Sequence, residues 1–128
     1  MIQQLTRGIK ITVDTDYNGS FLKDNVLHFA FVYQIEIENQ SKSSVQLLTR
    51  HWKIIETMNK NQYFNGTGFK GKKPLINPGE VHKYKSGCLL SSAFGAMKGT
   101  YTMIDLSSTK IFKVEIPLFR LSTLFVLN

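Results

Sequence analysis

The sequence has 128 residues, of which 42% are hydrophobic, and its formal net charge is +7. This length predicts one domain, residues 1–128, with enough apolar residues for a hydrophobic core. No apolar run approaches the roughly 20 residues that span a bilayer, so a channel or pump is excluded and no membrane insertion is expected. The single cysteine, Cys88, excludes an intrachain disulfide; together with the absence of a signal peptide, it predicts a cytoplasmic protein.

Alternating hydrophobic and polar residues predict about seven β-strands. An alternation with period two is typical of antiparallel strands that bury one face. In chain order, the expected strands are residues 9–13, 26–39, 45–57, 61–64, 81–90, 97–105 and 111–116. Leu48, Trp52 and Ile54 are expected to share the buried face of the strand at 45–57. Pro117 is expected to interrupt the last strand.

The connections between these strands carry residues that favour turns. Turns are predicted at Asn18-Gly19, Pro78-Gly79 and Lys98-Gly99, because glycine and proline permit or preset the required backbone angles. No segment has a sustained period of 3.6 residues. The fold class is therefore all-β, an immunoglobulin-like or fibronectin type III-like β-sandwich of about seven antiparallel strands.

The glycines at 66–71 have the spacing of a dinucleotide-binding fingerprint. That fingerprint functions where a strand precedes the glycines and a helix begins at the last one. Here Pro74 and the turn at 77–80 follow at once, and nothing after them continues a helix. The glycines are therefore expected in a loop between strands, and a Rossmann protein is excluded.

This loop is the main candidate for a binding site. Its backbone N–H groups could form a concave nest, with lysines that neutralise a phosphate or an acidic peptide. The alternative is that the glycines only permit tight bends and the lysines are solvated. Without a helix N-terminus, the affinity for a free nucleotide or pyrophosphate is expected to be weak and salt-sensitive. With the neighbouring strand, the candidate anion- or partner-binding residues are Gly66, Gly68, Lys70, Gly71, Lys72, Lys73, Lys83 and Lys85.

No catalytic residue, metal site or cofactor is expected. There are two pairs of acidic residues, and the two members of each pair lie two residues apart on a strand. Their side chains are then about 7 Å apart, a spacing that suits separate solvated charges better than one metal site. The pairs are Asp14 with Asp16 and Glu36 with Glu38, while the histidines, His28, His51 and His82, are scattered. Cys88 lies in an apolar run, where a free cysteine is usually a small buried hydrophobe. No Ser–His–Asp arrangement stands out, so the chain is not expected to be an enzyme.

Arg50 and Trp52 lie two residues apart on one expected strand and share a face. One interpretation is that Trp52 fills the core while Arg50 extends to its edge. The alternative is an interface patch at the rim of the sheet, since Trp and Arg often anchor interfaces. Residues 122–128 are apolar enough to pack on the domain or on a second copy, so a homodimer is an alternative to a monomer. Nucleic acid is not an expected partner, because no nucleic-acid-binding motif is present.

With the strands placed, the sequence resembles the bacterial ApaG family over almost its full length. Similar segments occur in order at residues 31–39, 45–54, 66–71, 74–80, 84–87, 95–103 and 116–121. They include a Q-L-L-x-R-x-W-x-I strand at 46–54 and a P-x-I-x-P-G-E turn at 74–80. The sequence departs from the family pattern at Phe69-Lys70, which replace two small apolar residues, and at 107–110, which replace a glycine-bearing turn.

This resemblance implies a fibronectin type III-like sandwich without known catalysis. It also implies a role in cobalt and magnesium efflux, and it relates the chain to domains of eukaryotic F-box proteins that look like protein-interaction modules. We therefore expect a non-enzymatic binding module whose partner is a protein with an acidic surface. The alternatives are a pyrophosphate or nucleotide sensor that uses the same loop, and a metal-homeostasis accessory that binds cobalt or magnesium directly.

Overall fold

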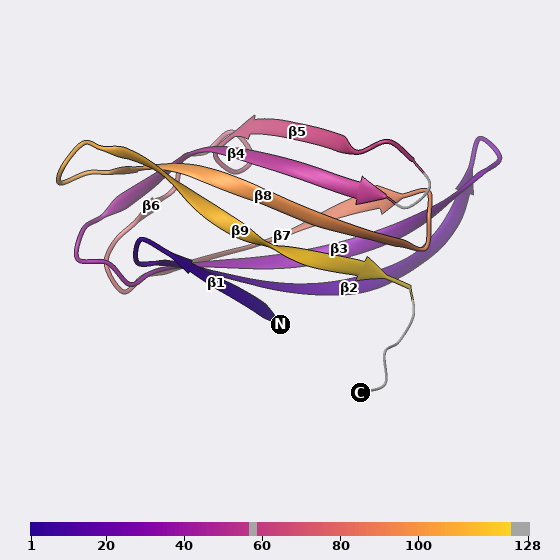
Figure 1. The fold of residues 1–128 in the computed structure, drawn as a ribbon, viewed down its shortest axis with the longest axis horizontal. Coiled ribbons are helices and arrows are strands. Elements are labelled where there is room, and N and C mark those ends of the chain that lie inside the picture. Colours follow the sequence, from indigo (N-terminus) through magenta and orange to yellow (C-terminus); the bar gives the residue numbers. More distant parts are fainter. Residues whose placement is uncertain (57–58, 124–128) are drawn as a thin grey trace.

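The computed structural model describes residues 1–56 and 59–123, and every helix or strand element in these residues is a β-strand (Figure 1). The strands are β1 (Ile2–Thr6), β2 (Ile9–Lys23), β3 (Val26–Asn39), β4 (Val45–Glu56), β5 (Gln62–Thr67), β6 (Leu75–Ile76), β7 (Val81–Leu90), β8 (Phe94–Asp105) and β9 (Ile111–Ser122). The predicted all-β class is confirmed. All seven expected strands are present, and β1 and β6 are additional. The expected end of one strand at Thr57, and most of the apolar segment 122–128, lie outside the described residues.

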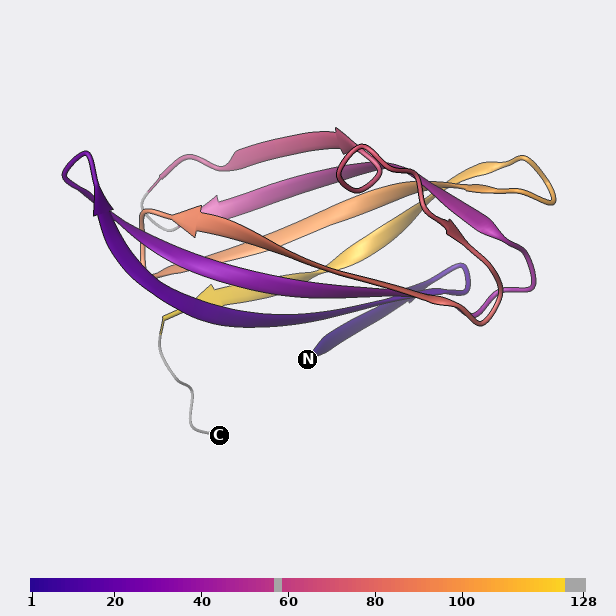
Figure 2. The same ribbon diagram turned by 180° about the vertical axis from the view of Figure 1, so that it is seen from behind.

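The strands form two antiparallel sheets that pack as a sandwich (Figure 1). One sheet has the order β1-β2-β3-β7, and the other has the order β5-β4-β8-β9, with β6 also paired to β4. At one flank β9 contacts β1 and β2. At the other flank the edge strands are β5 and β7, which face the viewer in Figure 2. No helix in the described part of the chain has the length and apolar character to cross a membrane.

The core lies between the two sheets and follows the period-two pattern. On β3 the inward residues Phe31, Tyr33 and Ile35 are buried. The Trp52 ring lies 5.4 Å from the Tyr33 ring and 5.9 Å from the Phe119 ring, measured between centroids, and so joins the two sheets. Such aromatic pairs each add about 0.5–1.5 kcal/mol beyond the burial of their area.

Two β-bulges change which residues face this core. On β4 the register shifts between Leu47 and Thr49, so Leu47 and Trp52 are both buried although they are five residues apart. Leu48, predicted to share the buried face of Trp52, is instead at the bulge and is only half-buried. A second register shift sets Pro117 and Leu118 of β9 opposite the single residue Lys98 of β8, so Pro117 lies inside β9 at a bulge of that strand. Pro117 interrupts the ladder as predicted, but the expected end of the strand at residue 116 is wrong: β9 continues to Ser122, because a bulge tolerates a residue that cannot donate a ladder hydrogen bond.

The predicted turns have different outcomes. Asn18-Gly19 lies within β2 at an irregularity, and Lys98-Gly99 lies within β8, so these two predictions are wrong. The hairpin between β2 and β3 turns instead at Asp24 and Asn25, whose φ angles of 52° and 62° are typical of a type I′ turn. The turn at Pro78-Gly79 is confirmed, with Gly79 at φ 84° and a 2.9 Å hydrogen bond from the Glu80 N–H to the Asn77 carbonyl.

Candidate functional site

The predicted binding loop interrupts an edge strand that runs beside β4. β5 pairs with β4 as far as Thr67, and β6 resumes the pairing at Leu75. Residues 68–74 form the excursion between these two pairings. The Gly68 N–H donates to the Leu48 carbonyl, 2.8 Å away, at the bulge of β4. The bulge therefore anchors the loop.

The tip of the loop is a two-residue turn. Phe69 and Lys72 exchange two backbone hydrogen bonds of 2.8 and 2.9 Å. Between them, Lys70 and Gly71 have φ angles of 51° and 75°, the geometry of a type I′ turn. The N–H groups of Gly68, Phe69 and Lys72 are thus used within the chain. The predicted nest cannot draw on these three amides, so fewer backbone donors are left for an anion than the glycine spacing predicts.

Close contacts explain two of the loop glycines. A Cβ atom at Gly68 would lie 1.8 Å from the Lys72 carbonyl oxygen, and Gly68 has a φ of 49°. A Cβ atom at Gly66 would lie 2.8 Å from Cζ of Arg50. Gly68 therefore requires glycine for the fold itself, which is the alternative that the sequence left open, whereas a side chain at position 66 would have to displace the Arg50 guanidinium.

The loop packs on the inner face of β7. The Phe69 ring lies 4.1 Å from the Tyr84 ring and 6.3 Å from the His82 ring, between centroids. Since Tyr84 is buried beneath Phe69, the Tyr84 ring cannot stack on a nucleic-acid base. The bulky Phe69 therefore joins the loop to the opposite sheet.

Lys70, Lys72 and Lys73 are exposed around a hollow that they share with Phe69, Pro74 and His82. The His82 Nε2 atom is buried, and no hydrogen-bond partner for it occurs among the described residues. Burial lowers the pKa of His82. The sequence did not single out His82 for this site. It lies on a separate strand, and no local spacing indicates its contact with the loop.

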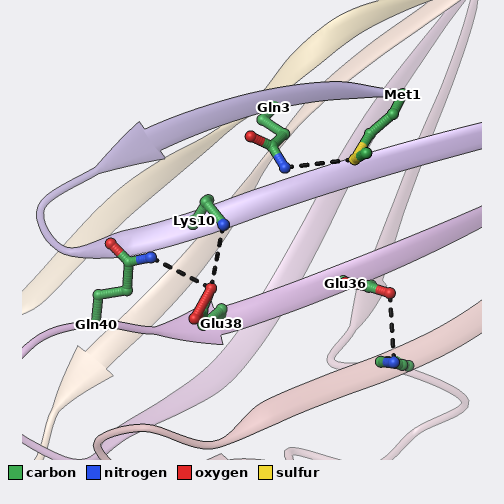
Figure 3. Close-up of polar contacts among 7 residues, drawn as sticks. Met1, Gln3, Lys10, Glu36, Glu38 and Gln40 are labelled. Carbon is green, nitrogen blue, oxygen red and sulfur yellow. Dashed lines mark hydrogen bonds and ion pairs between the residues drawn. The ribbon is translucent and has the colours of Figure 1, made fainter.

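Lys83 and Lys85 lie on the opposite, outer side of β7. The Lys83 ammonium is 3.4 Å from the Glu36 carboxylate, and that of Lys10 is 3.3 Å from Glu38 (Figure 3). The candidate lysines thus form two groups, one in the loop beside the inner face of β7 and one on its outer face. Lys83 has an acidic neighbour, whereas no ion pair involves Lys85 or the loop lysines among the described residues.

These contacts also bear on the acidic pairs considered as metal ligands. Glu36 and Glu38 each contact a different lysine, as separate charges would. Within residues 1–56 and 59–123, no group of three or more His, Cys, Asp or Glu side chains is arranged to hold a metal ion.

Trp52 and Arg50 have different environments despite sharing a face of β4. Trp52 belongs to the core and is 6% exposed. Arg50 is half-buried at the flank of β5 and β7, where its Nη1 donates to the carbonyls of Thr67 (3.1 Å) and Gly68 (2.6 Å). Arg50 thereby holds the base of the loop. An interface role for the pair remains a prediction.

Cys88 is half-buried on β7, and burial, followed by the negative charge of Glu56, raises the pKa of its thiol to about 12. Because only the thiolate is nucleophilic, alkylation of native Cys88 by iodoacetamide at pH 8 is expected to be at least about 100-fold slower than alkylation of the urea-unfolded chain. The native rate should rise about tenfold per pH unit from 7 to 10. Mass spectrometry of timed samples measures both rates. A native rate that levels off by pH 9 would contradict the expectation.

The fold and the loop define a class of small antiparallel β-sandwich domains with a glycine- and lysine-rich loop between two edge strands. A family model described as the ApaG domain, DUF525, matches residues 20–105. The chain belongs to the ApaG family, which confirms the resemblance found in the sequence.

Relatives match over nearly the whole chain. Protein ApaG of Chromohalobacter salexigens is 36% identical over 121 residues, covering 94% of this chain and 95% of the relative. Protein ApaG of Pseudomonas paraeruginosa is 40% identical over 114 residues, covering 89% of this chain and 90% of the relative. Among solved structures, an X-ray structure of a structural-genomics target has a TM-score of 0.85 at 34% identity, covering 91% of this chain and 87% of the other. A crystal structure of an ApaA protein from Bordetella pertussis has a TM-score of 0.78 at 30% identity, covering 89% and 92%.

Proposed function

We propose that this chain is a non-enzymatic, cytoplasmic binding module that captures an acidic segment of a partner protein along β7. The observation that carries the proposal is the position of the lysines on both sides of this strand. Lys70, Lys72 and Lys73 project from the loop packed on its inner face, and Lys83 and Lys85 lie on its outer face. Among the described residues β7 pairs only with β3, so its other backbone edge has no partner strand.

An extended acidic segment fits this arrangement. It could add to the unpaired edge of β7 by backbone hydrogen bonds, as in other cases of strand addition. Its alternating side chains would then point toward the two lysine groups in turn. Charge complementarity of this kind accelerates association and discriminates against basic partners.

The pyrophosphate or nucleotide alternative uses the same lysines and has less support. Three loop amides are used within the chain, and no helix N-terminus is present in the described residues to aid phosphate binding. Any part in cobalt or magnesium efflux would, in this proposal, be exerted through the protein partner rather than by direct metal binding.

The test is the affinity for a fluorescein-labelled octaglutamate peptide, measured by anisotropy at 50 mM salt. The double substitution Lys70→Glu with Lys72→Glu is expected to weaken binding at least about tenfold, because two attractive charges become repulsive. The matched control is Lys53→Glu with Lys98→Glu, which reverses two lysines paired across β4 and β8 in the other sheet. Both double variants change the net charge equally, so the control accounts for any general effect of net charge. Beyond that general effect, the control should change the affinity less than about twofold.

Two outcomes would count against the proposal. Equal losses in the two double variants would reduce the binding to net charge alone. In the second outcome, micromolar pyrophosphate displaces the peptide from the unmodified protein but does not bind the Lys70→Glu, Lys72→Glu variant. That result would show that the loop binds pyrophosphate and would support the nucleotide alternative instead.

A further inference from the structure

A second site is suggested by a cleft between the sheets at the flank of β5 and β7. The cleft has a volume of about 620 Å³, within the usual range of small-molecule pockets. Its walls come from both sheets and are mainly apolar and aromatic, including Phe31, Tyr33, Trp52, Phe64 and Leu89. The lysines of the binding loop do not line it. Residues 86–89 of β7 do line it, so the cleft adjoins the strand edge proposed to bind an acidic protein but does not include the lysines of that surface.

Arg50 is the one charged side chain among the described residues that line the cleft. It is half-buried, and no Asp or Glu among the described residues forms an ion pair with it. Its hydrogen bonds to the described residues both come from Nη1, so the guanidinium, with five N–H donors, keeps capacity for a further acceptor. A partly desolvated cation without a counter-charge favours an anion beside it.

The backbone is built around this guanidinium. Gly66 lies opposite Arg50 on β5, and a Cβ atom at Gly66 would lie 2.8 Å from Cζ and 2.9 Å from Nη2 of Arg50. A side chain at position 66 would displace the guanidinium. The two carbonyls that accept from Nη1 fix it further, so the positive charge is held in one place at the mouth of an apolar cleft.

We propose that this cleft binds a small amphipathic monocarboxylate, with the carboxylate paired to Arg50 and the apolar body against the aromatic walls. One cation and no acidic lining residue favour a single negative charge. The aromatic walls favour a hydrocarbon or aryl body over a sugar or nucleotide. Arginine binds carboxylates well because its planar donors match their two oxygens.

Trp52 provides the signal for the test, since it is the single tryptophan of the sequence and lines the cleft. Octanoate and octanol share one alkyl chain and differ in the carboxylate. Octanoate is expected to change Trp52 fluorescence saturably at pH 7.5, with an affinity about tenfold higher than that of octanol, because a charge-assisted pair is added. Equal affinities, or a change that never saturates, would overturn the proposal.

Substitutions separate the charge from the shape of the cleft. Arg50→Gln should remove the preference for octanoate while octanol still binds, which shows that the cleft persists. Lys113→Gln, an equal charge change at an exposed position of β9, should leave the preference intact. An Arg50→Gln variant that keeps the preference would overturn the proposal.

A second variant covers the case in which Arg50→Gln does not fold. Cys88→Leu enlarges an inward side chain that lines the cleft and retains Arg50; it should weaken octanoate and octanol alike. Unchanged binding of both probes would place them elsewhere and overturn the proposal. A hexapeptide with an apolar C-terminal residue serves as a competitor. If it displaces octanoate and binds the cleft more tightly than octanoate does, the cleft would be assigned to a protein partner instead.

Discussion

Replacing Asn39 by alanine is expected to lower the free energy of unfolding by about 3 kcal/mol, because several buried hydrogen bonds lose a partner at once. The Asn39 side chain is fully buried at the end of β3. Its Nδ2 donates to the carbonyls of Ile76 (2.9 Å) and Ser43 (2.8 Å). Its Oδ1 accepts from the backbone N–H (2.9 Å) and the hydroxyl (2.6 Å) of Ser41. Alanine removes both donors and the acceptor and leaves the Ile76 carbonyl buried without its donor.

The effect is large because Asn39 connects several segments. Its backbone N–H donates to the Glu80 carbonyl (3.0 Å), and its carbonyl accepts from the Gly79 N–H (2.8 Å). The residue thus joins β3 to the turn that leads into β7, while its side chain reaches β6 on the opposite sheet. One side chain therefore connects the end of β3 to β6, the strand that follows the binding loop.

Urea unfolding measures this loss, and two substitutions sharpen it. Asn61→Ala, at an exposed position outside the strands, should change the stability by less than about 0.5 kcal/mol. Asn39→Asp keeps the shape but loses the two Nδ2 donations and adds a carboxyl in a buried position. Burial raises the pKa of such a carboxyl above its unfolded value, so the protonated form is favoured in the folded state.

The sign of the pH dependence follows from that shift. The relative stability of the Asn39→Asp protein is greatest below the unfolded pKa of about 3.9 and falls as the pH rises through the higher folded value. The deficit against the unmodified protein should therefore be larger at pH 7 than at pH 4. An alanine variant within about 1 kcal/mol of the unmodified protein would show that water replaces the lost partners.

The sequence predicted best those strands whose alternation is uninterrupted. The expected bounds of the strands at 26–39 and 81–90 are the observed bounds of β3 and β7. Both strands keep one register with each other over their pairing, so every second side chain stays on one face. A period-two pattern contains all the information that such a strand requires.

Bulges explain the errors on the other sheet. On β4 and β9 the buried apolar residues switch from odd to even positions, or the reverse, at the bulge. On β4, for example, Leu47 is buried before the bulge and Trp52 after it. A bulge depends on how the partner strand pairs, so one sequence read alone does not reveal it. The same limitation made Pro117 resemble a strand end, although it lies within β9.

The residue types of the candidate loop were evident from the sequence, but the use of its backbone groups was not. The partners of the loop amides are the bulge at Leu48 and the Phe69–Lys72 exchange, and neither follows from glycine spacing. Likewise, one of the two interpretations of Arg50 placed it at the edge of the core, but its contact with the loop carbonyls depends on Gly66 pairing opposite it. Contacts between distant segments decide these features, and a local sequence pattern does not encode them.

Gly68→Ala is expected to lower the free energy of unfolding by about 3 kcal/mol, whereas Gly71→Ala should cost about 1 kcal/mol. Both glycines have positive φ, 49° and 75°, so both substitutions strain the backbone. They differ in space: a Cβ atom at Gly71 meets nothing within 4 Å, but one at Gly68 would lie 1.8 Å from the Lys72 carbonyl oxygen. The difference between the two variants therefore isolates the clash.

The clash also predicts where the structure yields. To accommodate a methyl group at position 68, the Lys72 carbonyl must move, which breaks its 2.8 Å hydrogen bond from the Phe69 N–H. Hydrogen exchange at the Phe69 amide should accelerate strongly in Gly68→Ala and little in Gly71→Ala. Because Phe69 holds the loop against Tyr84, the Gly68 variant should also bind the octaglutamate probe more weakly than the Gly71 variant. Equal stability losses and equal exchange rates in the two variants would show that the loop adjusts without this contact, and that its lysines are not positioned by it.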